Sequence, residues 1–95
     1  MAYVVCAKWT AREGLEERLQ QICDEMTEPS RAEPANLFYQ AHRSPENPRL
    51  FFLYEQYEDE AGYEAHMASE HFTRLVKGEA IPNLESRARE FYETL

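Results

Sequence analysis

The chain has 95 residues, of which 43% are hydrophobic and 29% are charged, and its formal net charge is −8. This size predicts one domain over residues 1–95 with a modest core, and an acidic balance without a basic cluster argues against nucleic-acid and anionic-membrane partners. No apolar run approaches the roughly 18 to 20 residues of a membrane span. No signal peptide is visible, so we expect a cytoplasmic protein.

The first half of the chain passes from a strand pattern to a helix pattern. Residues 2–10 are rich in β-branched and aromatic types, which predicts a strand. Apolar residues then recur from Leu15 to Met26 at spacings of four, three and four. This spacing predicts an amphipathic helix that Pro29 ends or nearly ends. Residues 28–34 are expected to form a loop.

The second half contains two strand patterns, a helical region and a last strand. Residues 35–43 and 49–57 are apolar and aromatic segments joined by a proline-rich turn, which predicts an antiparallel hairpin. A helical pattern covers residues 59–79, as one helix or as two pieces, because Ser69 has the character of a second helix cap. Residues 85–94 predict a fourth strand.

The element order is therefore β-α-β-β-α-β, which is the split-βαβ arrangement of an α+β, ferredoxin-like fold with an antiparallel sheet. Two helices can cover only one face of such a sheet, and a face in water should be polar. The strand at residues 49–57 is nevertheless apolar or aromatic on both faces. We therefore predict a homodimer in which two sheets pack face to face.

Two residue types suggest a site between helix and sheet. Glu55 is an acid set among apolar strand residues, so it is either a hydrogen-bonded structural group or a site acid or base with a raised pKa. His66 flanks the apolar stripe of the second helical region, and it is either a half-buried structural histidine or a donor or base in a cleft. A structural role is favoured for His71, and His42 is expected at the surface.

Several site classes are not expected. His66 and His71 are five residues apart instead of four, so no metal site is predicted. The chain has no phosphate-binding glycine loop or nucleotide fingerprint, so no cofactor is predicted. Cys6 and Cys23 lack a Cys-x-x-Cys arrangement and are expected as free thiols. Aromatic side chains outside the core can line a pocket for a flat organic ligand, to which Asn36 presents an amide unless it serves only as a turn residue.

Four segments carry a resemblance to a known family. They are Ala7-Lys8-Trp9 followed by Gly14, then Ser30 to Tyr39, then Phe51 to Asp59, and finally Ala65 to Phe72. Together they look like the antibiotic biosynthesis monooxygenase (ABM) domain family, including its quinol monooxygenase-like members. The resemblance covers nearly the whole chain. Its Tyr-Glu-x-Tyr-x-Asp and His-x-x-Ser-x-His-Phe motifs are more specific for the family than for one reaction.

The resemblance implies a dimeric α+β barrel, in agreement with the two-faced strands. In some members it implies cofactor-independent oxygenation of phenolic or quinol-like polycyclic compounds. In others it implies aldehyde or sugar-phosphate rearrangement, haem degradation, or no known activity. Haem is disfavoured, because the first strand lacks the Asn of haem-degrading relatives. Ala35 stands where the family usually has Gly before the Asn position.

The leading hypothesis is a cofactor-independent monooxygenase that uses O2 on a quinol-like or polycyclic aromatic molecule. The candidate site residues are His66 and Asn36 as catalytic groups and Tyr39, Glu55, Phe72 and Trp9 as substrate-binding groups. In this hypothesis His66 takes or shares the substrate proton. The alternatives are a non-catalytic dimeric module for ligand binding or stress response, and an isomerase of a small phosphorylated or dicarbonyl compound. The isomerase would need cationic residues, for which Arg43, Arg49 and Arg74 are placed.

Overall fold

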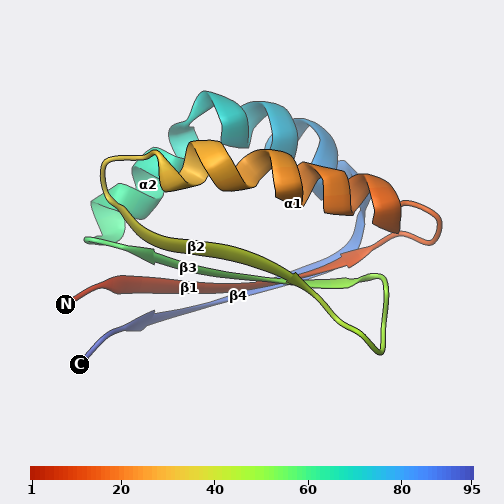
Figure 1. The fold of residues 1–95 in the computed structure, drawn as a ribbon, viewed down its shortest axis with the longest axis horizontal. Coiled ribbons are helices and arrows are strands. Elements are labelled where there is room, and N and C mark those ends of the chain that lie inside the picture. Colours follow the sequence, from red (N-terminus) through yellow and green to blue (C-terminus); the bar gives the residue numbers. More distant parts are fainter.

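A single antiparallel sheet carries all the helices on one of its faces (Figure 1). The computed structural model describes residues 1–95, and the strand order is β2-β3-β1-β4. The strands are β1 (Tyr3–Ala11), β2 (Asn36–Arg43), β3 (Leu50–Tyr57) and β4 (Leu84–Glu93). The helical segments are α1 (Glu16–Arg31), α2 (Glu60–Ala68), the π-helical η1 (Phe72–Ala80) and the short 3-10 turn η2 (Ile81–Asn83). The predicted ferredoxin-like order of elements is confirmed.

The sequence placed the strands to within one residue, and the region 59–79 does consist of two helical pieces. Pro29 nearly ends the first helix, which continues for two more residues to Arg31, and the expected loop over residues 28–34 is wrong for residues 28–31. The last turn of α1 is held by tertiary contacts that a local pattern does not contain. Ser30 is fully buried, and the Arg31 Nε donates a hydrogen bond to the Tyr39 carbonyl at 3.0 Å. These contacts outweigh the hydrogen bond that proline removes.

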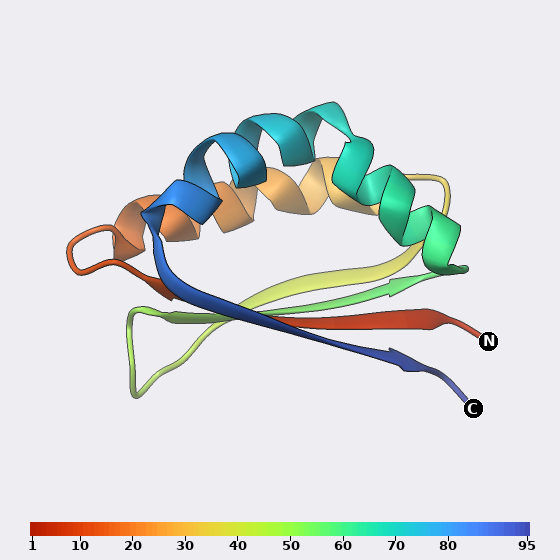
Figure 2. The same cartoon turned by 180° about the vertical axis from the view of Figure 1, so that it is seen from behind.

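Both chain termini lie at the same end of the sheet, as the view from behind shows (Figure 2). The Thr94 amide donates to the Ala2 carbonyl at 3.0 Å, which joins the two ends. At this end α2 begins directly after β3 and passes very close to it. A Cβ atom at Gly62 would lie 2.8 Å from the Ala35 Cβ and 3.3 Å from the Tyr57 Cβ. Glycine is therefore required for this approach of helix and strand.

The core fills the space between the helices and the sheet. A large cluster joins α1 and η1 to the middle of the sheet and includes Trp9, Ile22 and Phe51. A second, smaller cluster of Val5, Tyr57 and Tyr63 lies nearer the termini. None of the helices has the length and apolarity that crossing a membrane requires.

The other face of the sheet carries no helix (Figures 1 and 2). The pairing register places on it the apolar and aromatic side chains Val4, Cys6, Phe38, Phe52, Tyr54 and Tyr92. Phe38 is 48% exposed and Tyr92 is 52% exposed. We call this surface the open face. The structure therefore confirms that both faces of the sheet carry apolar side chains.

Candidate functional site

A chain of polar side chains runs through the apolar layer between sheet and helices. The Tyr57 hydroxyl donates to Glu55 Oε1 at 2.6 Å, and the same oxygen lies 3.6 Å from His66 Nε2. On the other side of the imidazole, His66 Nδ1 lies 2.8 Å from Glu33 Oε2. That carboxylate oxygen is also 2.5 Å from His71 Nε2. These five residues form one connected group, which we call the polar chain.

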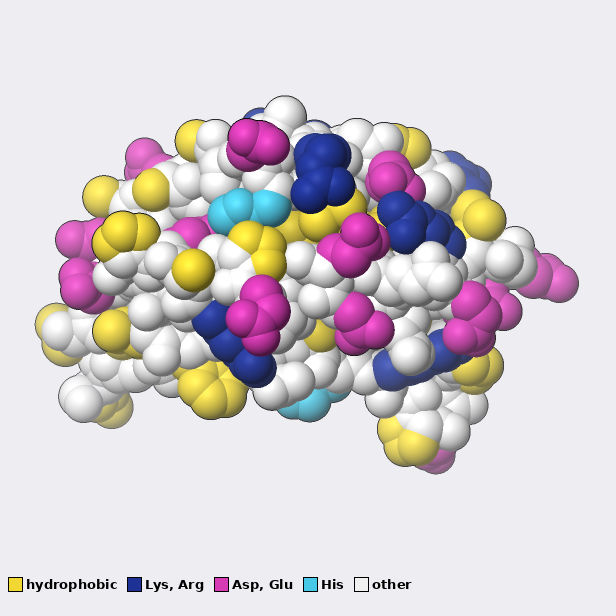
Figure 3. All heavy atoms as spheres, turned by 45° about the horizontal axis from the view of Figure 1, so that its top comes forward, with side chains coloured by type: hydrophobic (Ala, Val, Ile, Leu, Met, Phe, Trp, Pro, Cys, Tyr) yellow, Lys and Arg dark blue, Asp and Glu magenta, His cyan; other side chains and the backbone are white.

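The polar chain is buried at one end and reaches solvent at the other. Glu55 is 4% exposed and His66 is 2% exposed, whereas the side chains of Glu33 and His71 are 14% and 16% exposed. On the helix side of the molecule, histidine atoms (cyan) reach the surface next to acidic and hydrophobic groups (Figure 3). Both ring nitrogens of His66 face carboxylates. Glu33 and His71 therefore form the end of the polar chain that reaches solvent.

Burial shifts the titration of the groups around Glu55. Removal from water raises the pKa of Glu55, while His66 and the Tyr57 hydrogen bond act in the opposite direction. Burial and the neighbouring Glu55 raise the pKa of Tyr57, and the same two causes raise the pKa of Tyr39. Both tyrosines therefore remain neutral at physiological pH and can act as hydrogen-bond donors.

A bend between α2 and η1 brings the two histidines to one carboxylate. Ser69 has an extended backbone, and its Oγ donates to the His66 carbonyl at 2.6 Å. The Phe72 amide in turn donates to Ser69 Oγ at 3.2 Å. Ser69 therefore closes one helix and caps the next. The prediction of no metal site rested on the five-residue spacing of His66 and His71 along one helix. The chain is not one helix there, because Ser69 interrupts it.

Four of the six residues proposed from the sequence lie together. The His66 ring is 5.1 Å from the Phe72 ring and 5.8 Å from the Tyr39 ring, measured between centroids. Glu55 is the register partner of Tyr39 on the neighbouring strand. No cavity opens among these side chains, so the space between α2 and the sheet is filled at this point.

The other two proposed residues lie apart from this group. The Asn36 side-chain amide donates to the Phe38 carbonyl at 3.2 Å, within its own strand. Trp9 belongs to the large core cluster and pairs with Phe51 instead of with the Glu55 row. Sequence reasoning missed Glu33, which it assigned to a loop. Tyr57 could have been found, because a residue two positions after Glu55 points to the same face of the strand.

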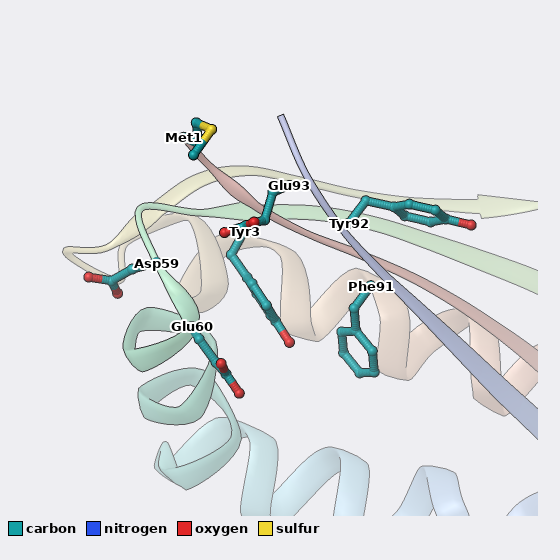
Figure 4. Close-up of a pocket in the computed structure, with 7 residues that line it drawn as sticks. All are labelled: Met1, Tyr3, Asp59, Glu60, Phe91, Tyr92 and Glu93. Carbon is teal, nitrogen blue, oxygen red and sulfur yellow. The ribbon is translucent and has the colours of Figure 1, made fainter. Parts of the chain in front are cut away.

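A pocket of about 500 Å³ lies beside this group, between the start of α2 and the terminal ends of β1 and β4. It is lined by Met1, Tyr3, Asp59, Glu60, Phe91, Tyr92 and Glu93. Figure 4 shows Tyr3 and Phe91 extending on the same side of the sheet toward α2, with Glu60 opposite them. The two rings stack with centroids 5.8 Å apart. We call this the terminal pocket.

Aromatic contacts join the terminal pocket to the polar chain. The Tyr63 ring lies 6.0 Å from Tyr3 and 5.9 Å from Phe91, and on its other side it stacks on His66 at 6.1 Å. The Tyr63 hydroxyl accepts a hydrogen bond from Arg89 at 3.0 Å. The lining itself contains three carboxylates and no Lys or Arg. Burial, with Glu60 as the next cause, raises the pKa of Tyr3.

Comparison with known proteins identifies the family. The family model described as antibiotic biosynthesis monooxygenase matches residues 2–78. The chain belongs to the ABM family. Protein PA3566 from Pseudomonas aeruginosa is 31% identical, with a TM-score of 0.91 over 99% of this chain and 94% of that one. No curated protein matches the chain in sequence.

Two further solved structures illustrate how the fold recurs. A structure described as an antibiotic biosynthesis monooxygenase is 25% identical, with a TM-score of 0.89, and the match covers 100% of this chain and 99% of that one. A conserved protein from Methanosarcina mazei is 21% identical, with a TM-score of 0.90, over 100% of this chain and 94% of that one. At that identity the second likeness concerns the fold alone. The resemblance found in the sequence motifs is therefore confirmed at the level of the family.

Proposed function

We propose that this ABM-family chain is a monooxygenase that oxidises a quinol-like or polycyclic aromatic molecule with O2 and without a bound cofactor. The observation that carries the proposal is the terminal pocket, with its stacked aromatic wall and carboxylate rim. Aromatic rings favour a flat aromatic ligand, and carboxylates accept hydrogen bonds from its hydroxyl groups. The name of the solved relative at 25% identity, a monooxygenase, adds support.

The charge of the pocket separates this proposal from the isomerase alternative. A phosphorylated substrate requires Lys, Arg or a cluster of backbone amides, and the terminal pocket is lined by Asp59, Glu60 and Glu93 without a basic residue. Of the three arginines that the sequence offered for this role, Arg43 and Arg49 bind Glu17 and Glu85 at the other end of the sheet, and Arg74 lies on η1 outside the pocket lining. The pocket therefore favours a hydroxylated aromatic over a phosphate ester.

The reaction can be balanced with the substrate as the only reductant. A carboxylate at the rim, Glu60 or Glu93, accepts the proton of a substrate hydroxyl. The resulting phenolate transfers an electron to O2, and recombination at a ring carbon forms a hydroperoxide that loses water. One oxygen atom stays on the ring and the other leaves as water. A hydroquinone would thus yield a hydroxylated quinone and one molecule of water.

The polar chain has a positioning role in this proposal. His66 lies behind Tyr63 and has carboxylates at both ring nitrogens, so it does not reach the pocket directly. It fixes α2, and with it Glu60 and Tyr63, against the sheet. Tyr39, Glu55 and Phe72 hold His66 in place instead of contacting the substrate.

We further propose that the chain forms a homodimer through its open face. A monomer would leave Phe38 and Tyr92, on the two edge strands of this face, about half exposed, and exposed apolar surface of this kind marks interaction sites. A second copy is the natural occupant, because the same strands supply an identical apolar face. Tyr92 and Met1 also line the terminal pocket, so the partner would lie next to it.

The proposed activity is tested by O2 uptake with a hydroquinone or an anthrone. We expect turnover with water as the reduced product, detected as uptake that catalase does not reverse. A Glu60→Gln, Glu93→Gln variant should lose about 100-fold in kcat/KM because it lacks the proton acceptors. The control is Glu58→Gln, an exposed acid outside the pocket. Ligand-induced thermal stabilisation without O2 uptake would instead establish the non-catalytic binding module.

A further inference from the structure

We propose that Glu33, His66 and His71 form a binding site for one divalent transition-metal ion of the zinc class. The carboxylate and imidazole donor atoms of these three residues all lie within 4.8 Å of one another. They come from the loop after α1, from α2, and from the residue before η1. The site is therefore assembled by the fold, and it involves none of the residues that line the terminal pocket.

The separations between the donor atoms are close to those that a metal ion imposes. Glu33 Oε2 lies 2.8 Å from His66 Nδ1 and 2.5 Å from His71 Nε2. In a tetrahedral site, metal–ligand bonds of about 2.0–2.2 Å place neighbouring ligand atoms roughly 3.3–3.6 Å apart. Replacing the shared hydrogens with a metal ion therefore requires the donor atoms to separate by roughly 0.5–1 Å. Glu33 and His71 are the partly exposed members, so these movements occur on the side that faces solvent.

His66 is already oriented as a metal ligand would be. When Nδ1 binds the ion, the hydrogen of the imidazole lies on Nε2, which faces Glu55 Oε1 at 3.6 Å. Glu55 in turn accepts the Tyr57 hydroxyl at 2.6 Å. Histidine ligands almost always donate their second ring N–H to such an outer carboxylate, which fixes the tautomer and the ring orientation. Glu55 is placed to give this support once the 3.6 Å separation closes to hydrogen-bond distance.

The donor set selects the class of ion. Two imidazoles and one carboxylate suit Zn²⁺ and the neighbouring divalent ions Co²⁺, Ni²⁺ and Fe²⁺. Mg²⁺ and Ca²⁺ prefer oxygen ligands throughout, and the soft ion Cu⁺ prefers thiolates. Three protein ligands leave a coordination position for water on the solvent side. An ion here would cross-link the α1 loop, α2 and η1.

The site is tested by titrating untagged, chelator-treated protein with Co²⁺ and with Zn²⁺. We expect one Co²⁺ per chain with visible absorption bands, displacement of Co²⁺ by Zn²⁺, and a rise in melting temperature that EDTA reverses. His71→Gln should weaken Zn²⁺ binding at least 10-fold in calorimetry. The glutamine amide can still donate to Glu33, so this variant is expected to fold. Glu33→Gln should have a similar effect.

The matched controls are His42→Ala, a histidine on the opposite face, and Glu70→Gln, an exposed acid between α2 and η1. Both should bind Co²⁺ like the unmodified chain. The proposal is overturned if no Co²⁺ absorption develops at millimolar metal. It is also overturned if a His71→Gln, Glu33→Gln double variant binds Zn²⁺ with unchanged affinity. Neither readout depends on turnover, so failure here is distinct from failure of the proposed oxygenase.

Discussion

The two faces of the sheet are made from the same strands and differ in what covers them. On β3, Phe51 and Leu53 point toward the helices and are buried, whereas the alternating Phe52 and Tyr54 lie on the open face and are only partly covered. Both sets are apolar or aromatic. A strand that is apolar on both faces is expected to be covered on both faces. The helices of this chain cover only one face of β3.

The helix-covered face is itself divided into two regions. Its middle is a continuous apolar cluster, and its terminal end holds Glu55 and His66 within a ring of aromatic side chains. Buried charged groups stabilise a fold only when they are paired and hydrogen-bonded, and their removal singly is costly. Polar groups therefore occupy space at the terminal end that apolar side chains fill in the middle of the sheet. The terminal pocket lies next to these polar groups.

The largest contrast between the faces should appear on truncating adjacent phenylalanines of β3. Phe51→Ala leaves a cavity in the buried cluster and should lower the free energy of unfolding by about 3–5 kcal/mol. Phe52→Ala, on the open face, should lower it by about 1 kcal/mol. Urea unfolding at low protein concentration measures both. Equal losses would mean that the open face is already packed within the monomer.

A second contrast concerns the close approach of α2 to the sheet. Gly62→Ala would place a Cβ 2.8 Å from the Ala35 Cβ, and it should destabilise the protein by about 1–3 kcal/mol. Gly78→Ala is the matched control, because its Cβ would meet only the Thr73 carbonyl at 3.4 Å. That control should change stability by less than about 1 kcal/mol. Thermal unfolding distinguishes them, and an equally mild Gly62→Ala would show that α2 can move away from β3.

The elements followed from local patterns, while the sites depend on contacts between distant segments. The strand limits and the division at Ser69 could be predicted, because strand-forming residue types, turn signals and capping are local. The role of Glu33 could not be predicted, because this loop residue meets His66 and His71 only in the folded protein. Tyr3 and Phe91 come from opposite ends of the chain and meet only because β1 pairs with β4. The last turn of α1, beyond Pro29, likewise depends on contacts with residues outside the helix.

The smallest expected effect concerns the proposed dimer. It can be measured without any substitution, as the alkylation rates of the two native thiols. Cys6 lies on the open face, and burial, Glu90 and Glu55 raise its pKa. Cys23 faces the core, where burial raises its pKa to about 12. At pH 8 we expect no alkylation of Cys23 in the folded protein. Cys6 should react slowly in dilute solution and more slowly still at concentrations where the open face is covered.

Phe38→Glu sharpens this test, because it places a charge on the open face at a side chain that is already half exposed. The variant should remain folded, become monomeric in light scattering, and alkylate Cys6 at a rate that no longer depends on protein concentration. Thr73→Glu adds the same charge to the exposed side of η1 and should leave the dimer intact. If Cys6 reacts at the same rate in Phe38→Glu and in the unmodified chain at every concentration, no second copy covers the open face. The apolar residues of that face would then require a different partner.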